Sequence, residues 1–225
     1  MRRYRYRFPL LLGALLLLLL TAPLSQGVEA ASGSNVRGLV VGLLFASVVV
    51  TGVIAASESR RTIVFAVLLG LPPFCLQLVV PEASDVNVPR ATHAFTLVFL
   101  IYALVPIVRF LVRGRRVTLD TICAALCTYL LIGIIFASAY SLLELYDTKA
   151  FNTPGSVPFS ESSEGSIYFS FVTLTTLGYG EITPASPEAR TLAMFEAILG
   201  QFFLTVLVAW LVGLYIASGR EQPPE

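Results

Sequence analysis

The feature that most constrains this chain is a series of long apolar stretches that contain almost no charge. A helix needs about 20 consecutive apolar residues to cross a bilayer core. A first stretch, Phe8–Leu24, is marginal. Five others come close to that length or exceed it: Gly38–Ala56, Thr62–Val80, Ala94–Val112, Thr121–Tyr146 and Thr191–Ala217. Of the 225 residues, 56% are hydrophobic and only 13% are charged, which is too apolar for a soluble domain of this size. The sequence therefore predicts an all-α membrane protein with about six transmembrane helices.

The basic residues are distributed unevenly between the two sides of such a protein. Loops rich in lysine and arginine remain in the cytoplasm. With the N-terminus inside, eleven arginines fall at the cytoplasmic face and four basic residues fall outside. The eleven are Arg2, Arg3, Arg5, Arg7, Arg60, Arg61, Arg109, Arg113, Arg115, Arg116 and Arg220, and the four are Arg37, Arg90, Lys149 and Arg190. We expect a multi-pass protein of the plasma membrane whose N- and C-termini are both cytoplasmic.

The first apolar stretch has two interpretations. Arginines, a leucine-rich core and the run Val28-Glu29-Ala30 before Ala31 are typical of a cleavable signal peptide. However, Phe8–Leu24 is longer than the usual apolar core of a signal peptide, which favours a retained helix. The second stretch begins outside in either case, so the remaining topology does not depend on this choice.

The segment between the last two long stretches carries the chemistry. A loop, Asn152–Gly165, is followed by about three turns of apolar and hydroxyl residues, which is too short to cross a bilayer. Then comes Thr176-Leu177-Gly178-Tyr179-Gly180, in which glycine permits backbone angles that other residues avoid. Non-helical backbone at membrane depth occurs only where it is buried in protein or lines an aqueous path. The pattern predicts a re-entrant pore helix and a selectivity filter.

These residues resemble the filter of the potassium channel superfamily, whose pattern is Thr-Val-Gly-Tyr-Gly. Leu177 stands in place of the valine, and Glu181 stands where aspartate commonly follows. The resemblance continues through Thr183-Pro184 to Gly200, where the family often has an inner-helix hinge. The whole is similar to small bacterial six-span potassium channels without large cytosolic domains. It implies a membrane region of about four helices at 1–117, a pore module at 118–218 and a short cytoplasmic tail at 219–225.

The resemblance also implies ligands for the permeant ion. K⁺ would bind the carbonyl oxygens of Thr176, Leu177, Gly178 and Tyr179 and the hydroxyl of Thr176, with Gly180 completing the filter. Thr175 lies near the end of the pore helix, whose negative dipole end would face the cation. One chain supplies one filter segment, so a homotetramer is implied. We expect membrane lipid and other copies of the chain as partners, with no cofactor, nucleic acid or small-molecule ligand.

The last helix contributes further candidates. Glu196 is either a filter support, bonded to Ser170 or Thr173 of the pore helix, or an interfacial carboxylate near the outer water. Glu181 and Thr175 are the other expected filter supports. The resemblance implies that a set of residues on this helix lines the cavity and the gate, although the same spacing also suits ordinary helix packing: Gly200, Gln201, Leu204, Val208 and Val212.

Other functions have weaker support. A voltage sensor repeats arginine through the membrane, whereas Phe95–Val108 carries no charge, so Arg109, Arg113 and Arg116 are interpreted as anchors. Cys75, Cys123, Cys127 and Tyr168 are expected to pack, and His93 to lie at an interface. An intramembrane enzyme would need a nucleophile–base pair, which is not visible, so no enzyme activity is predicted. A non-conducting regulatory subunit remains the alternative to a channel.

Overall fold

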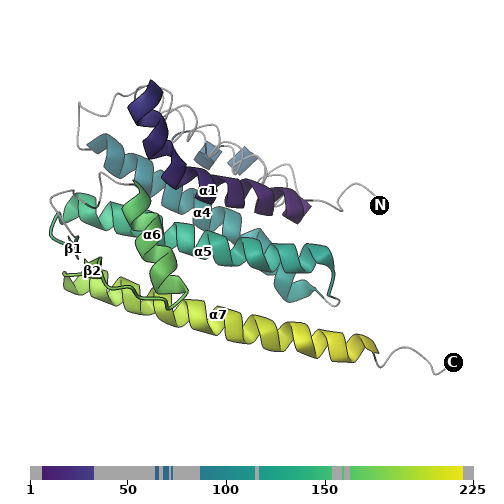
Figure 1. Cartoon of the computed structure of the whole chain (residues 1–225). Coiled ribbons are helices and arrows are strands. Elements are labelled where there is room, and N and C mark those ends of the chain that lie inside the picture. The colour runs from purple at the N-terminus through teal and green to yellow at the C-terminus, as the bar shows by residue number, and fades with distance from the viewer. Residues whose placement is uncertain are drawn as a thin grey trace.

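The structure is a computed structural model that describes residues 7–32, 64–65, 68–70, 72, 87–114, 117–153, 159 and 163–219. Four long helices run lengthwise through this part, and one short helix crosses them near one end (Figure 1). The helices are α1 (Arg7–Ser32), α4 (Asn87–Arg113), α5 (Leu119–Tyr146), α6 (Ser163–Leu174) and α7 (Pro187–Gly219), and the strands are β1 (Phe151–Asn152) and β2 (Thr183–Pro184).

Three of the described helices, α4, α5 and α7, are long and apolar enough to cross a membrane. They contain the last three predicted spans. The first predicted span, Phe8–Leu24, lies within α1. The second, Gly38–Ala56, and most of the third, Thr62–Val80, lie outside the described residues. The total of about six spans therefore stays a prediction.

Some predicted boundaries were wrong because a purely apolar pattern does not include the capped ends of helices. α7 begins at Pro187, four residues before the predicted start, since the Ser186 hydroxyl accepts a bond from Ala189 N at 3.1 Å. Proline in the first turn and the acidic Glu188 also favour a helix start there. Helix α6 begins at Ser163, so it takes in the last residues of the predicted loop Asn152–Gly165.

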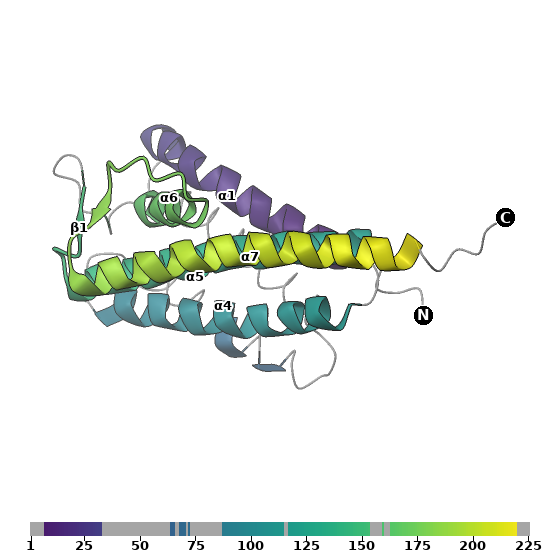
Figure 2. The same ribbon diagram turned by 90° about the horizontal axis from the view of Figure 1, so that it is seen from below.

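Helix α5 is the central element of the described fold. Its start is capped by the Thr118 hydroxyl, which accepts a bond from Thr121 N at 3.2 Å. In Figure 2, α4 lies on one side of α5, and α1 and α6 lie on the other side. Side chains from these helices bury one another in a common core, for example Leu15 of α1, Phe99 of α4 and Leu131 of α5. Cys127 is buried in this core, as predicted, and Cys123 packs against it.

A second core lies where α5, α6 and α7 approach the strands. Phe151 stacks on Phe159 with ring centroids 4.3 Å apart, and Tyr140 meets Phe169 edge-on at 5.0 Å. The antiparallel pair β1–β2 joins Phe151 to Pro184. This two-residue ladder is an addition to the all-α architecture that was predicted. It ties the chain that leaves the filter segment to the end of α5.

Candidate functional site

Helix α6 is held against α5 by close polar and steric contacts. The Ser166 and Ser141 hydroxyls lie 2.9 Å apart, and the Ser170 hydroxyl lies 2.7 Å from the carbonyl oxygen of Gly133. A Cβ built on Gly133 would come within 2.8 Å of the Phe171 ring. Glycine at position 133 therefore lets the two helices approach closely, and α6 is fixed along its length.

The backbone beyond α6 folds onto the end of that helix. Leu177 N and Gly178 N both donate to the carbonyl oxygen of Val172, at 2.9 and 3.2 Å, and Thr176 N donates to Thr173 O at 2.9 Å. These bonds use carbonyl groups that the last turn of a helix otherwise leaves unsatisfied. The predicted filter thus begins directly at the C-terminal end of α6.

The filter segment has a regular alternation of backbone conformation. Thr176, Gly178 and Gly180 have φ angles of 59°, 59° and 88°, in the left-handed region, while Leu177 and Tyr179 do not. Carbonyls alternate sides along an ordinary extended chain, and left-handed angles at every second residue allow them to face one direction. A Cβ on Gly178 would meet nothing within 4 Å. The requirement for glycine at position 178 is therefore conformational and not one of space.

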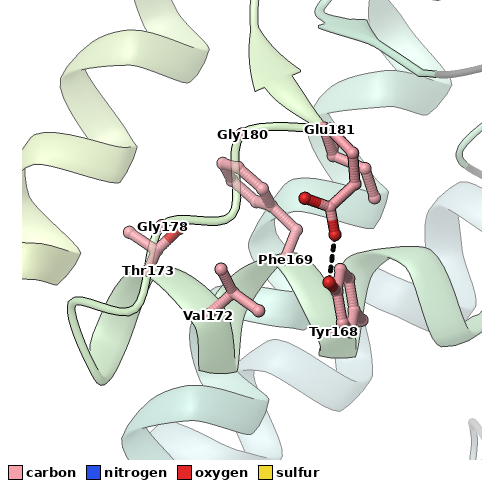
Figure 3. A pocket seen from close by; sticks show the side chains of 8 residues that line it. Tyr168, Phe169, Val172, Thr173, Gly178, Gly180 and Glu181 are labelled. Atoms are coloured by element: carbon pink, nitrogen blue, oxygen red, sulfur yellow. Dashed lines mark hydrogen bonds between the residues drawn. The ribbon is translucent and has the colours of Figure 1, made fainter.

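The residue after the filter is tied back to α6. Tyr168 donates its hydroxyl to Glu181 Oε1, as Figure 3 shows, at the edge of a shallow pocket that Gly178 and Val172 also line. This bond raises the pKa of Tyr168 to about 12. Packing was the favoured expectation for Tyr168, but its side chain is 40% exposed. It hydrogen-bonds Glu181 because the chain after Gly180 returns over α6.

Glu196 of α7 is fully buried and meets two other helices. Tyr140 of α5 donates its hydroxyl to Glu196 Oε2 at 2.5 Å, and the Ser170 hydroxyl of α6 is hydrogen-bonded to Glu196 Oε1. Of the two interpretations left open, the bond to Ser170 is present. The Glu196 side chain is not exposed to water at an interface, because it is fully buried within the chain. Tyr140 was not predicted from the sequence. Its one signal was a phenolic hydroxyl within a long apolar run.

Gly200 and Gln201 lie where α7 passes the end of α6. A Cβ on Gly200 would come within 2.3 Å of the Leu174 carbonyl oxygen, so only glycine allows this approach. The next residue, Gln201, donates from Nε2 to Thr176 Oγ1 at 3.1 Å. Gly200 is buried, which differs from the predicted lining role, because it faces α6. The other four predicted lining residues are exposed in the subunit: Gln201, Leu204, Val208 and Val212.

The structure therefore brings most of the predicted residues together around the end of α6. Thr175 hydrogen-bonds its hydroxyl to Phe171 O at 2.6 Å and begins the turn into the filter segment. Thr176 to Glu181 follow it, and Glu196, Gly200 and Gln201 approach from α7. Leu204, Val208 and Val212 lie farther along α7, beyond the last contact with this segment that we describe.

Comparison with known proteins agrees with this arrangement. The sequence model of a family described as "Ion channel" matches residues 124–216. Protein LctB of Bacillus caldotenax is 32% identical over 97 residues, which cover 42% of this chain and 72% of LctB. Two pore potassium channel c of Oryza sativa subsp. japonica is 38% identical over 56 residues, 25% of this chain but only 12% of the rice protein. No solved structure matches the chain significantly.

The matched region contains α6, the filter segment and almost all of α5 and α7. The chain belongs to the potassium channel superfamily, and its long apolar helices are those of a membrane protein.

Proposed function

We propose that this chain is one subunit of a potassium-selective channel that conducts K⁺ passively. The carbonyl oxygens of Thr176 to Tyr179, with the Thr176 hydroxyl, would replace the hydration shell of the ion. The observation that carries the proposal is the left-handed backbone at Thr176, Gly178 and Gly180, since this alternation suits a row of inward carbonyls. The name of the rice relative, a two pore potassium channel, also supports potassium as the permeant ion.

The proposed channel is a homotetramer. One chain provides one row of carbonyls, whereas an ion that loses its water needs ligands on every side. The filter segment is open in the single subunit, with Leu177 55% and Tyr179 67% exposed. Four copies around an axis would enclose the ion, and each α6 would direct the negative end of its dipole toward the ion path.

We further propose a multi-pass arrangement in the plasma membrane with both termini cytoplasmic. The start of α1 and the end of α7 lie at the same end of the described helices (Figure 1), which supports termini on one side. The excess of arginine expected on that side supports the cytoplasm. The packing of Leu11 and Leu15 of α1 in the core with α5 supports a retained first helix rather than a cleaved signal peptide.

The proposed channel has no voltage sensor of the arginine-repeat type. Helix α4 has an interior without charge from Phe95 to Val108, and Arg109 and Arg113 are exposed near its end. A charge contributes to voltage dependence only if it moves through the membrane field. We expect the conductance to change little with voltage.

Reversal potentials in reconstituted liposomes with K⁺ on one side and Na⁺ on the other test the proposal. The parent protein should show a reversal potential dominated by K⁺. Gly178→Ala should abolish or strongly reduce the K⁺ current while the protein still assembles, because strain at such a position costs about 1–3 kcal/mol in each subunit. Val172→Ala on α6 is the matched control, and it should have a milder effect because it removes only packing.

Two results would overturn the proposal. Equal permeability for K⁺ and Na⁺ would contradict a selective filter. A protein that assembles, as cross-linking reports, and carries no current alone would favour the non-conducting regulatory subunit.

A further inference from the structure

Thr176, the first residue of the filter segment, is held from α7. Its hydroxyl oxygen lies 2.6 Å from Thr175 O and 3.1 Å from Gln201 Nε2. A threonine hydroxyl has one proton and two acceptor positions. The proton is used by Thr175 O, so the hydroxyl must accept from Gln201. This network determines the orientation of the Gln201 amide, with its N–H groups toward Thr176.

The Gln201 amide acts on an atom that the proposed function assigns to the ion. One acceptor position of the Thr176 hydroxyl is occupied by an N–H group, whose positive end lies beside the place where a cation would bind. The positive end of this N–H dipole repels a nearby cation, and the repulsion grows as the distance between them falls. The innermost filter site is the one that the Thr176 hydroxyl would help to form. We propose that Gln201 sets the ion affinity of this site and that its amide weakens cation binding there. This inference rests on the proposed function.

The backbone of α7 at Gln201 is positioned by neighbouring contacts. Gly200 allows the helix to lie against the Leu174 carbonyl, and Glu196, about one turn earlier, is hydrogen-bonded to Ser170. Both neighbours are buried. The Gln201 side chain therefore starts from a positioned stretch of backbone, and its bond to Thr176 Oγ1 at 3.1 Å directs the amide toward the hydroxyl.

Weakened binding at the innermost site fits the requirement for conduction. Ions must bind well enough to lose water but weakly enough to leave. Because Gln201 belongs to α7 and Thr176 follows α6, any shift of α7 relative to α6 changes this contact. The ion affinity of the innermost site thereby depends on the position of the last helix.

Block of K⁺ current by Ba²⁺ tests the inference, since Ba²⁺ is close to K⁺ in size and, with its double charge, binds more tightly. Gln201→Leu removes the donor and keeps a side chain of similar length. Its half-blocking Ba²⁺ concentration should fall about 3- to 10-fold, which corresponds to about 0.6–1.4 kcal/mol in total for the four amides that the variant removes from the proposed tetramer. Gln201→Lys adds a positive charge and should shift the half-blocking concentration in the opposite direction. Val206→Ala, at a side chain that is 66% exposed on the same helix, should leave it unchanged.

The inference is overturned if the half-blocking Ba²⁺ concentration of Gln201→Leu equals or exceeds that of the parent protein. Calorimetric Ba²⁺ binding to the purified protein gives the same comparison for a variant that carries no current. Reversal potentials recorded from the same liposomes separate the two proposals. If the parent is K⁺-selective and Gln201→Leu has the same half-blocking Ba²⁺ concentration as the parent, only the role of Gln201 is refuted. If the parent is not K⁺-selective, the proposed function itself is refuted.

Discussion

The helices α5 and α7, which flank the filter segment, are both long and apolar but differ in how the subunit covers them. They have 28 and 33 residues, and both could cross a membrane by length and composition. Half of the most apolar stretch of α5 is buried within the subunit, against 11% of the corresponding stretch of α7. Helix α5 makes its most extensive contacts with α4, α6 and α1, whereas α7 contacts α6, α5 and β2 less extensively.

The difference shows two ways of holding a helix. Helix α5 is stabilised by a broad apolar core to which several helices contribute. Helix α7 is positioned by close contacts of Glu196, Gly200 and Gln201 and by limited apolar packing, such as the Phe203 ring stacked on Tyr129. Large side chains such as Phe202 remain exposed. Exposed apolar area of this kind marks a surface that lipid or another chain covers. The subunit therefore completes the packing of α5 but leaves α7 to its surroundings, as the proposed tetramer requires.

The largest expected effect comes from truncating one side chain to alanine on α5, compared with a similar truncation on α7. Leu131→Ala on α5, where the side chain is 1% exposed, should lower the free energy of unfolding by about 2–5 kcal/mol. Val206→Ala on α7, with a side chain 66% exposed, should change it by less than about 0.5 kcal/mol in the isolated subunit. Unfolding in detergent at a concentration that keeps subunits separate measures both. Equal losses would show that α7 is covered as well as α5, and the comparison would fail.

A smaller effect is expected where α7 approaches α6. Gly200→Ala brings a Cβ to within 2.3 Å of a backbone oxygen, which cannot rotate away. We expect destabilisation toward the upper end of about 1–3 kcal/mol, because overpacking forces the two helices apart. Loss of K⁺ flux should accompany it. Gly213→Ala on the same helix is the control, since its Cβ meets nothing within 4 Å. If Gly200→Ala has the same free energy of unfolding and the same K⁺ flux as Gly213→Ala, then α7 does not approach α6 closely at Gly200.

The smallest effect is expected for Glu196→Gln. Glutamine can accept the bond from Tyr140 and donate to Ser170, which leaves the Ser170 proton free for Gly133 O. The free energy of unfolding should therefore fall by less than about 1 kcal/mol. Glu196→Ala should cost more, about 1–3 kcal/mol, because it leaves the buried Tyr140 hydroxyl without its acceptor. Thermal unfolding of both variants distinguishes them. If glutamine is as damaging as alanine, a carboxylate is needed at position 196 rather than two hydrogen bonds.

The sequence alone predicted much of the described fold because the information is local. Apolar runs located α4, α5 and α7 to within a few residues at most ends, and the glycine pattern located the filter segment after a short helix. The starts of α7 and α4 were missed by several residues because their first turns contain polar residues and proline and so fall outside the apolar runs. The bond from Glu196 to Ser170 was one of two open interpretations, since a carboxylate inside an apolar run implies a buried partner without saying which.

The sequence by itself determined which segments are apolar helices and that Gly178 and Gly180 suit left-handed angles, since both depend on local residue type; the left-handed angle at Thr176 had no such signal. Only the tertiary structure decided that Tyr140 meets Glu196, that Gly200 faces Leu174 and that Gln201 reaches Thr176. Helical periodicity defines the faces of a helix but not its rotation or its height against a neighbour. Those two quantities follow from how side chains of α5, α6 and α7 fill the space between the helices, and a change of one residue in register would give each of these groups a different partner.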